Sequence, residues 1–248
     1  KAQEFVVDNI LAAGRVVVAG ERGIGKTSAL VPLLLTATGL LQNWSVTATV
    51  KRKVIYVSED IDQVRRIVDA LYEKSFLTCS AEELDSWFKL VDAQRLSAEE
   101  IVKVAPDYKR LYTDNKRRDG TNLPAAPVIC FDTTNATMDI SDGNNNAEVS
   151  KTVATLREGF SGIPMVMVGH VAKASRKGTD NLTFVGAGSW EGDTTQNLYL
   201  IVEGDDRYLK IGKNRFSAEI TEYLLQSHVS EIRAEDPLGY FVDIKTFF

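Results

Sequence analysis

The chain has little cysteine, no long apolar run and no strong charge of either sign. Its two cysteines, Cys79 and Cys130, form neither a metal-binding nor a disulfide pattern, and Cys130 lies in an apolar run where a small buried side chain is typical. No stretch approaches the apolar length of a membrane span, and no signal peptide is recognised, so we expect a cytoplasmic protein without a membrane partner. The net charge of −5 excludes a surface that attracts nucleic acid as a whole, so any such contact must come from a local patch.

The length of 248 residues fits one large α/β domain covering 1–248, with a polar, partly helical insertion at about 80–124. The sequence opens on Lys1 rather than methionine, with only a short amphipathic stretch before the first expected strand. We therefore expect a fragment of a longer protein, with a domain missing upstream.

Short apolar runs alternate with helical patterns, which predicts βαβ units and a mainly parallel sheet flanked by helices. In the insertion, Ser80 and Ser97 each precede a glutamate by three residues, which predicts one helix from Ser80 to about Val91 and another starting at Ser97. Two polar loops, 133–146 and 172–188, follow later strands, and the first is expected to be mobile. The expected strands cover 16–19, 54–57, 127–131, 165–168, 198–202 and 208–212, with an edge strand at 240–242, and the main helices cover 28–35, 61–71 and 147–160.

A phosphate-binding loop lies between the first strand and the first helix, which is the context that the pattern G-x-x-x-x-G-K-[ST] requires. Its glycines let backbone N–H groups face the phosphates, and the helix N-terminus adds partial positive charge. Lys26 would reach the β- and γ-phosphates of ATP, and the Thr27 hydroxyl would ligate Mg²⁺. A structural glycine turn would explain the glycines but not the Lys-Thr pair. The expected nucleotide-binding residues are Gly20, Glu21, Arg22, Gly23, Ile24, Gly25, Lys26, Thr27 and Ser28.

Three further polar residues end the other expected strands, and ligands of open α/β sheets bind at those ends. Asp132 is predicted to hold Mg²⁺ beside Thr27, although an acid at a strand end also commonly begins a turn. Glu59 is the favoured base for the attacking water, because it ends the strand expected beside the phosphate-loop strand, whereas its competitor Asp60 is the expected cap of the next helix. His170 could sense the γ-phosphate, or be a structural histidine.

Lys213 and Arg215 are two residues apart on an expected strand, so their side chains share one face. Such a cationic pair could stabilise the transferring phosphoryl group of a neighbouring subunit. Spacing alone favours ordinary surface charges on an exposed hairpin.

Together these segments resemble the RecA/DnaB-like hexameric P-loop ATPases, most closely the plasmid replicative helicase RepA group. The resemblance is carried, in the family's order, by residues 20–27, 54–60, 128–132, 166–173, 186–190 and 212–215. It implies a RecA-like P-loop core with a C-terminal β-hairpin region, assembled as a homo-oligomeric, hexameric ring. By the same resemblance, Glu59 is the catalytic base, His170 the γ-phosphate sensor, and Lys213 and Arg215 are the fingers that reach the next subunit's nucleotide.

The resemblance also implies that the two polar loops line a central channel and contact single-stranded DNA. The residues suited to its backbone are Lys173, Arg176 and Lys177, whereas the first loop carries Asp139 and Asp142, which disfavour phosphate contact. At the sensor position the family often has two adjacent histidines or a glutamine, whereas this chain has a glycine before His170.

The function that these features favour is an ATP-hydrolysing, helicase-type ring motor that translocates on single-stranded DNA in replication. A RecA-like recombination or packaging ATPase remains an alternative. An ATP-switched module that recruits a partner is a third possibility. A small-molecule kinase is disfavoured by the late Lys-x-Arg and by the absence of an obvious lid.

Overall fold

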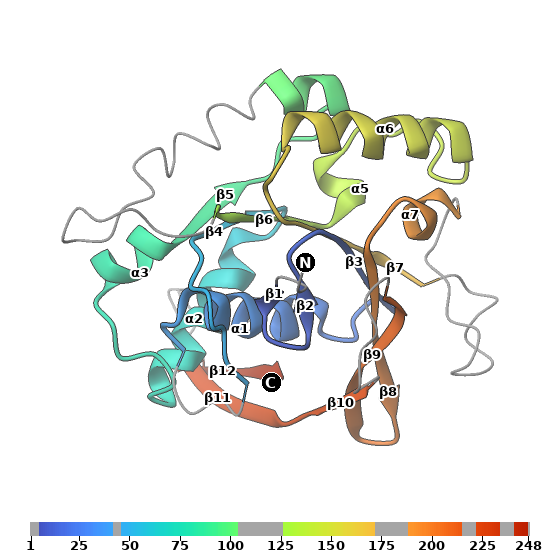
Figure 1. Cartoon of the computed structure of the whole chain (residues 1–248). Coiled ribbons are helices and arrows are strands. Elements are labelled where there is room, and N and C mark those ends of the chain that lie inside the picture. Colours follow the sequence, from blue (N-terminus) through green and yellow to red (C-terminus); the bar gives the residue numbers. More distant parts are fainter. Residues whose placement is uncertain are drawn as a thin grey trace.

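Parallel strands build the centre of the fold (Figure 1). The computed structural model describes residues 5–41, 46–103, 126–171, 188–214, 222–233 and 241–247. Within this part of the chain, eight strands form one sheet in the order β10-β9-β8-β3-β7-β6-β4-β5. All neighbours from β8 to β5 are parallel, whereas β9 is antiparallel to β8 and to β10. The strands are β3 (Arg15–Gly20), β4 (Val54–Ser58), β5 (Phe88–Asp92), β6 (Val128–Asp132), β7 (Met165–His170), β8 (Gln196–Glu203), β9 (Asp206–Asn214) and β10 (Glu222–Leu225).

Helices cover both faces of this sheet, which confirms the predicted α/β architecture. Helices α1 (Lys26–Thr38) and α2 (Ile61–Glu73) pack on the face that includes Val16 and Val18, and α6 (Asn146–Gly159) packs on the face that includes Val17 and Ala19. Because alternate residues of β3 enter two separate cores, the strand is continuously apolar from Val16 to Ala19. Among the described helices, none combines the length and the apolar character needed to cross a membrane.

Two small sheets lie outside the main one. β1 (Phe5–Val7) pairs with β2 (Leu11–Ala12), where the sequence suggested only an amphipathic stretch. β11 (Ser227–Arg233) pairs with β12 (Phe241–Phe247), and this hairpin packs against α1 and α2. The edge strand predicted at 240–242 corresponds to the start of β12, which lies in this two-stranded sheet, whereas β10 forms an edge of the main sheet.

The insertion predicted at 80–124 begins as expected but soon differs. Ser80 caps α3 (Ala81–Trp87) by accepting from the Glu83 N–H, yet the helix ends before Val91, because the next residues form β5 along the free edge of β4. Burial of Phe88 favours a strand here over the predicted helix, since Phe88 is 5% exposed and stacks on Tyr56. Residues 98–103 are helical after a reciprocal Ser97–Glu100 capping box, and 104–125 lie outside the described residues.

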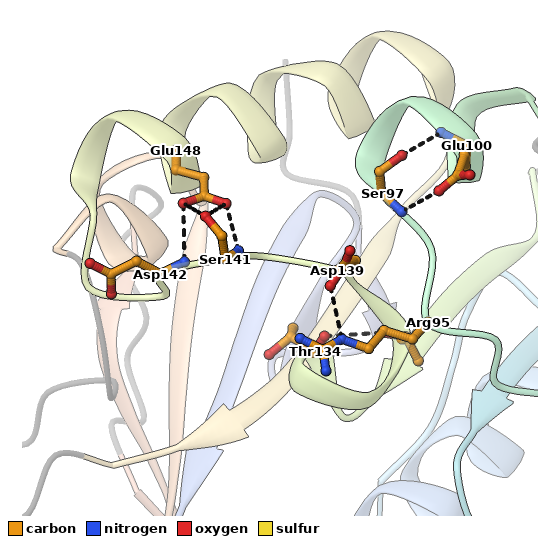
Figure 2. A network of polar contacts seen from close by, with 9 residues as sticks. Arg95, Ser97, Glu100, Thr134, Asp139, Ser141, Asp142 and Glu148 are labelled. Carbon is orange, nitrogen blue, oxygen red and sulfur yellow. Dashed lines mark hydrogen bonds and ion pairs between the residues drawn. The ribbon is translucent and has the colours of Figure 1, made fainter.

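The first polar loop, expected to be mobile at 133–146, is held by side chains (Figure 2). It opens with helix α5 (Thr134–Thr137) and a buried Met138, which forms a bridge to Leu96. Glu148 of α6 then accepts hydrogen bonds from the backbone and hydroxyl of Ser141 and from the Asp142 N–H. Polar residues of this loop therefore take part in hydrogen bonds within the protein. Of the second loop, 172–187 lie outside the described residues, and Gly188 precedes helix α7 (Ser189–Gly192).

Candidate active site

The strand order brings the carboxyl ends of β3, β7, β6 and β4 to one edge of the sheet. Gly20 pairs with His170 on β7, and Ser58 of β4 pairs with Asp132 of β6. The expectation that β4 lies beside the phosphate-loop strand is wrong, because β7 and β6 come between them. Glu59 nevertheless reaches the same edge, and its backbone N–H donates to the Asp132 carbonyl oxygen at 3.2 Å.

Lys26 is folded back into the phosphate loop. The residue is 7% exposed, and Nζ donates to the carbonyl oxygens of Gly20 at 3.0 Å and Glu21 at 2.8 Å. Nζ also lies 3.2 Å from His170 Nδ1. Burial lowers the pKa of His170, and the Lys26 charge lowers it further, so the imidazole is suited to accept this hydrogen bond in its neutral form.

The pKa of Lys26 predicts how nucleotide binding depends on pH. Burial lowers this pKa from 10.5 to about 8, and the nearby Arg22 charge also lowers it, whereas the Asp132 carboxylate opposes the shift. Below this pKa the free protein presents an ammonium to the phosphates, and above it the amine must take up a proton before pairing with them. We therefore expect the affinity for ADP to fall by up to about tenfold per pH unit above the Lys26 pKa. Fluorescence titration with a labelled ADP across this range would measure the effect, and a constant affinity would contradict the prediction.

Asp132 is a buried acceptor for two hydroxyl groups. Its side chain is 4% exposed, and Oδ2 accepts from Thr27 Oγ1 at 2.8 Å and from the Tyr56 hydroxyl at 2.6 Å. Burial raises the pKa of this carboxyl group, and the two hydrogen bonds oppose that shift. The sequence did not point to Tyr56, whose side chain is completely buried on β4 and read simply as part of an apolar strand.

Replacing Tyr56 with phenylalanine tests how strongly this carboxylate depends on its donors. The Tyr56→Phe change keeps the ring and leaves Asp132 with one donor fewer in a buried site. We expect the free energy of unfolding to fall by about 1.5–3 kcal/mol, the range for hydrogen bonds to charged groups. Urea unfolding at neutral pH would measure it. The matched control is Tyr72→Phe, whose hydroxyl lies 3.5 Å from Cys79 Sγ. Equal losses in the two variants would contradict the prediction.

The arrangement around Thr27 fits a magnesium ion bound together with a nucleotide. Mg²⁺ usually keeps several waters and takes only one or two protein ligands besides phosphate oxygens. The Thr27 hydroxyl and Asp132 carboxylate already contact each other, so both face the same point. No group of three or more His, Cys, Asp or Glu side chains that could hold a metal ion occurs among the described residues.

Glu59 and Asp60 have different surroundings although they are adjacent. Asp60 caps α2 by accepting from the Gln63 N–H at 2.9 Å, which confirms the predicted cap. Glu59 is exposed, and its Oε1 lies 3.4 Å from the Thr133 hydroxyl. Glu59 therefore remains the better candidate for the base, since Asp60 is engaged by its helix.

These residues line one cleft of about 560 Å³, a size typical of small-ligand sites. Most of the expected nucleotide-binding residues face it, together with the candidate base, sensor and metal ligand. Thr133 and Gln63 also line the cleft and were not expected from the sequence. The lining residues are Arg22, Gly23, Gly25, Lys26, Thr27, Ser28, Ser58, Glu59, Asp60, Gln63, Asp132, Thr133 and His170.

Of the two expected finger residues, the structure places only the backbone of Lys213. Lys213 lies near the end of β9, beside Asn214, which pairs with Gln196 at the start of β8. Gln196 in turn pairs with Val16, four residues before Gly20, so the Asn214 backbone lies roughly 13 Å along the strands from the level of Gly20, given about 3.3 Å per strand residue. The Lys213 backbone is one residue nearer to that level. Arg215 and the DNA-contact candidates Lys173, Arg176 and Lys177 lie outside the described residues.

The fold and this cleft define a P-loop nucleotide-binding protein with a RecA-like α/β core. The family profile described as AAA domain matches residues 1–176, which is more than half of the chain. The chain therefore belongs to the AAA domain family of P-loop ATPases.

One solved structure, described as an ATPase domain, matches with a TM-score of 0.56 at 12% identity. The alignment covers 86% of this chain and 81% of that chain, and at this identity it supports the fold. No curated protein sequence matches the chain.

Proposed function

We propose that this chain is the ATPase unit of a RecA/DnaB-like ring motor that hydrolyses ATP and translocates on single-stranded DNA in replication. The observation that carries the proposal is the convergence of Lys26, Thr27, Asp132, His170 and Glu59 on one cleft. A phosphate loop alone would support nucleotide binding but not hydrolysis. A loop joined by a buried carboxylate, an exposed carboxylate and a neutral histidine also supports cleavage of the terminal phosphate.

In the proposed reaction, water attacks the γ-phosphorus of ATP and the bond to the β-phosphate oxygen breaks, leaving ADP and phosphate. Glu59 accepts the proton of the attacking water. Lys26 leaves its carbonyl partners and pairs with the β- and γ-phosphates, and His170 is released to contact the γ-phosphate. Thr27 and Asp132 would hold Mg²⁺, which when bound neutralises charge on the phosphate oxygens.

Sequence resemblance to the plasmid replicative helicase RepA group supports a hexamer. The Lys213 backbone lies towards the ends of β3 and β8 that are farther from the cleft. This position is consistent with fingers that act on a neighbouring subunit. A recombination or packaging motor would share all of these features, and so would a slow ATP-driven switch that recruits a partner.

One pair of measurements tests the proposal. The ATPase rate and the sedimentation coefficient should each be measured with and without single-stranded DNA, in the presence of Mg²⁺. We expect a nucleotide-dependent hexamer whose turnover rises with DNA. Equal turnover with and without DNA would refute the DNA motor. Unwinding of a forked duplex would separate a helicase from a recombination or packaging motor.

A further inference from the structure

The phosphate loop has a tight contact with a residue of the C-terminal hairpin, Phe247. Phe247 of β12 is 3% exposed and packs with Ile24, Ala29 and Leu200 in a small apolar cluster. A Cβ atom placed on Gly25 would lie 2.6 Å from Phe247 Cε2, so the ring touches the loop backbone and leaves no room for a methyl group. Two features therefore require glycine at position 25: the close contact with the Phe247 ring and a φ of 96°.

Arg207, at the start of β9, supports the same turn through a hydrogen bond. Its Nε donates to the Ile24 carbonyl oxygen at 3.1 Å. Its guanidinium carbon lies 4.1 Å from the centre of the Phe247 ring, which is a cation–π geometry. Ile24, Phe247 and Arg207 are far apart in the sequence, so β9 and β12 meet the loop only through tertiary structure.

The opposite side of the loop is open. Gly23 has a φ of 76°, and no described atom lies within 4 Å of a Cβ atom built on it. Gly23 also lines the cleft. The loop is therefore packed on the side of Phe247 and free on the side where phosphates would bind.

The hydrogen bond from Arg207 to the Ile24 carbonyl also fixes the direction of the Gly25 N–H. The Ile24 carbonyl and the Gly25 N–H belong to one peptide unit, in which the two groups point in opposite directions. Holding this carbonyl towards Arg207 turns the Gly25 N–H away from Arg207. Nucleotide binding by such a loop depends on backbone N–H groups that already face the phosphates, because ordering them at binding would weaken affinity.

We propose that Phe247 and Arg207 are positioning residues for the nucleotide: they hold the Ile24–Gly25 turn of the phosphate loop in its binding conformation. They act through the loop and need no contact with the phosphates. The proposal rests on the proposed function only in requiring that the cleft binds a nucleotide. It makes the hairpin β11–β12 part of the binding site, although most of the hairpin packs on α1 and α2.

The test compares the full chain with Arg207→Gln, Arg207→Lys, Phe247→Ala and Phe247→Leu. The matched control is Phe76→Ala, because the Phe76 ring packs edge-on against His228 of the same hairpin, with 4.8 Å between ring centres. Phe76 packs against the larger core and is not part of the apolar cluster around Phe247. For each protein, the dissociation constant of a fluorescently labelled ADP, KM and kcat for ATP, and the melting temperature without nucleotide should be measured.

We expect Phe247→Ala and Arg207→Gln to weaken ADP binding about tenfold and to raise KM by a similar factor, with a smaller change in kcat. The conservative variants Phe247→Leu and Arg207→Lys should bind ADP more tightly than Phe247→Ala and Arg207→Gln, respectively. Phe76→Ala should lower the melting temperature while keeping the affinity within about twofold.

Unchanged affinity in a folded Arg207→Gln protein and a folded Phe247→Leu protein would overturn the positioning role. Equal loss of affinity in Phe76→Ala would also overturn it, because general loosening of the hairpin would then explain the effect. Absence of ADP binding by the unmodified chain would instead refute the nucleotide site, and this proposal with it. The milder Phe247→Leu keeps the test decisive if Phe247→Ala does not fold.

Discussion

The Glu59→Gln protein is expected to bind ATP normally and to lose about 100- to 10,000-fold in kcat, the range that general-base catalysis contributes. The change keeps the size of the side chain and its ability to accept from Thr133, which lies 3.4 Å away, but it removes the group that takes the proton of the attacking water. Single-turnover hydrolysis and ATP titration would separate chemistry from binding.

The neighbouring residue provides the control. Asp60 lines the same cleft, but its carboxylate caps α2, and asparagine is an equally good cap. Asp60→Asn should therefore keep both turnover and stability. If Glu59→Gln turns over at the normal rate, the assignment of the base is wrong, and a loss confined to Asp60→Asn would transfer the role to Asp60.

The second large effect is expected from Arg215→Ala, which should reduce kcat by about 1,000- to 100,000-fold if Arg215 acts as an arginine finger. The Lys213 backbone, on β9, lies away from the level of the cleft in its own subunit, and this leads us to expect that the fingers act between subunits. In a ring that mixes Lys26→Ala with Arg215→Ala subunits, some sites combine an intact cleft with an intact finger. These sites should restore part of the activity.

Mixing Lys26→Ala with Glu59→Gln subunits is the control for this experiment. Lys26 and Glu59 line the same cleft of one chain, so every site in such a ring carries one defect. We expect no recovery in this mixture. Recovery in neither mixture, at any ratio of subunits, would refute action between subunits.

Much of the fold follows from local patterns in the sequence. The strands of the main sheet have short, continuous apolar runs, and caps such as Asp60 and Ser80 mark where helices begin, so β3, β4, β6 and β7 were located closely. β5 was predicted as helix because its sequence continues a helical pattern, and only the free edge of β4 made a strand more stable there. The hairpin β11–β12 was missed in part for the same reason, since its stability comes from packing on α1 and α2.

The candidate site shows the same division. Phosphate-loop residues, Asp132 and Glu59 are recognisable from the sequence, because each stands at the end of an apolar strand or in a defined pattern. Tyr56 and Phe247 carry no such signal, since Tyr56 is an aromatic residue in an apolar strand and Phe247 is an aromatic residue at the end of a mixed one. Their roles depend on which polar or backbone atom lies opposite them after folding.

The sequence by itself determined that this chain carries a phosphate-loop pattern between a strand and a helix, and that acids and a histidine end neighbouring strands. Those features depend on residues close together in the chain, whose backbone preferences are local. Tertiary structure alone decided that β7 and β6 separate β4 from β3, that Tyr56 donates to Asp132, and that Phe247 and Arg207 contact the phosphate loop. These contacts join residues far apart in the chain, and they form only when strand pairing and core packing bring the distant elements together.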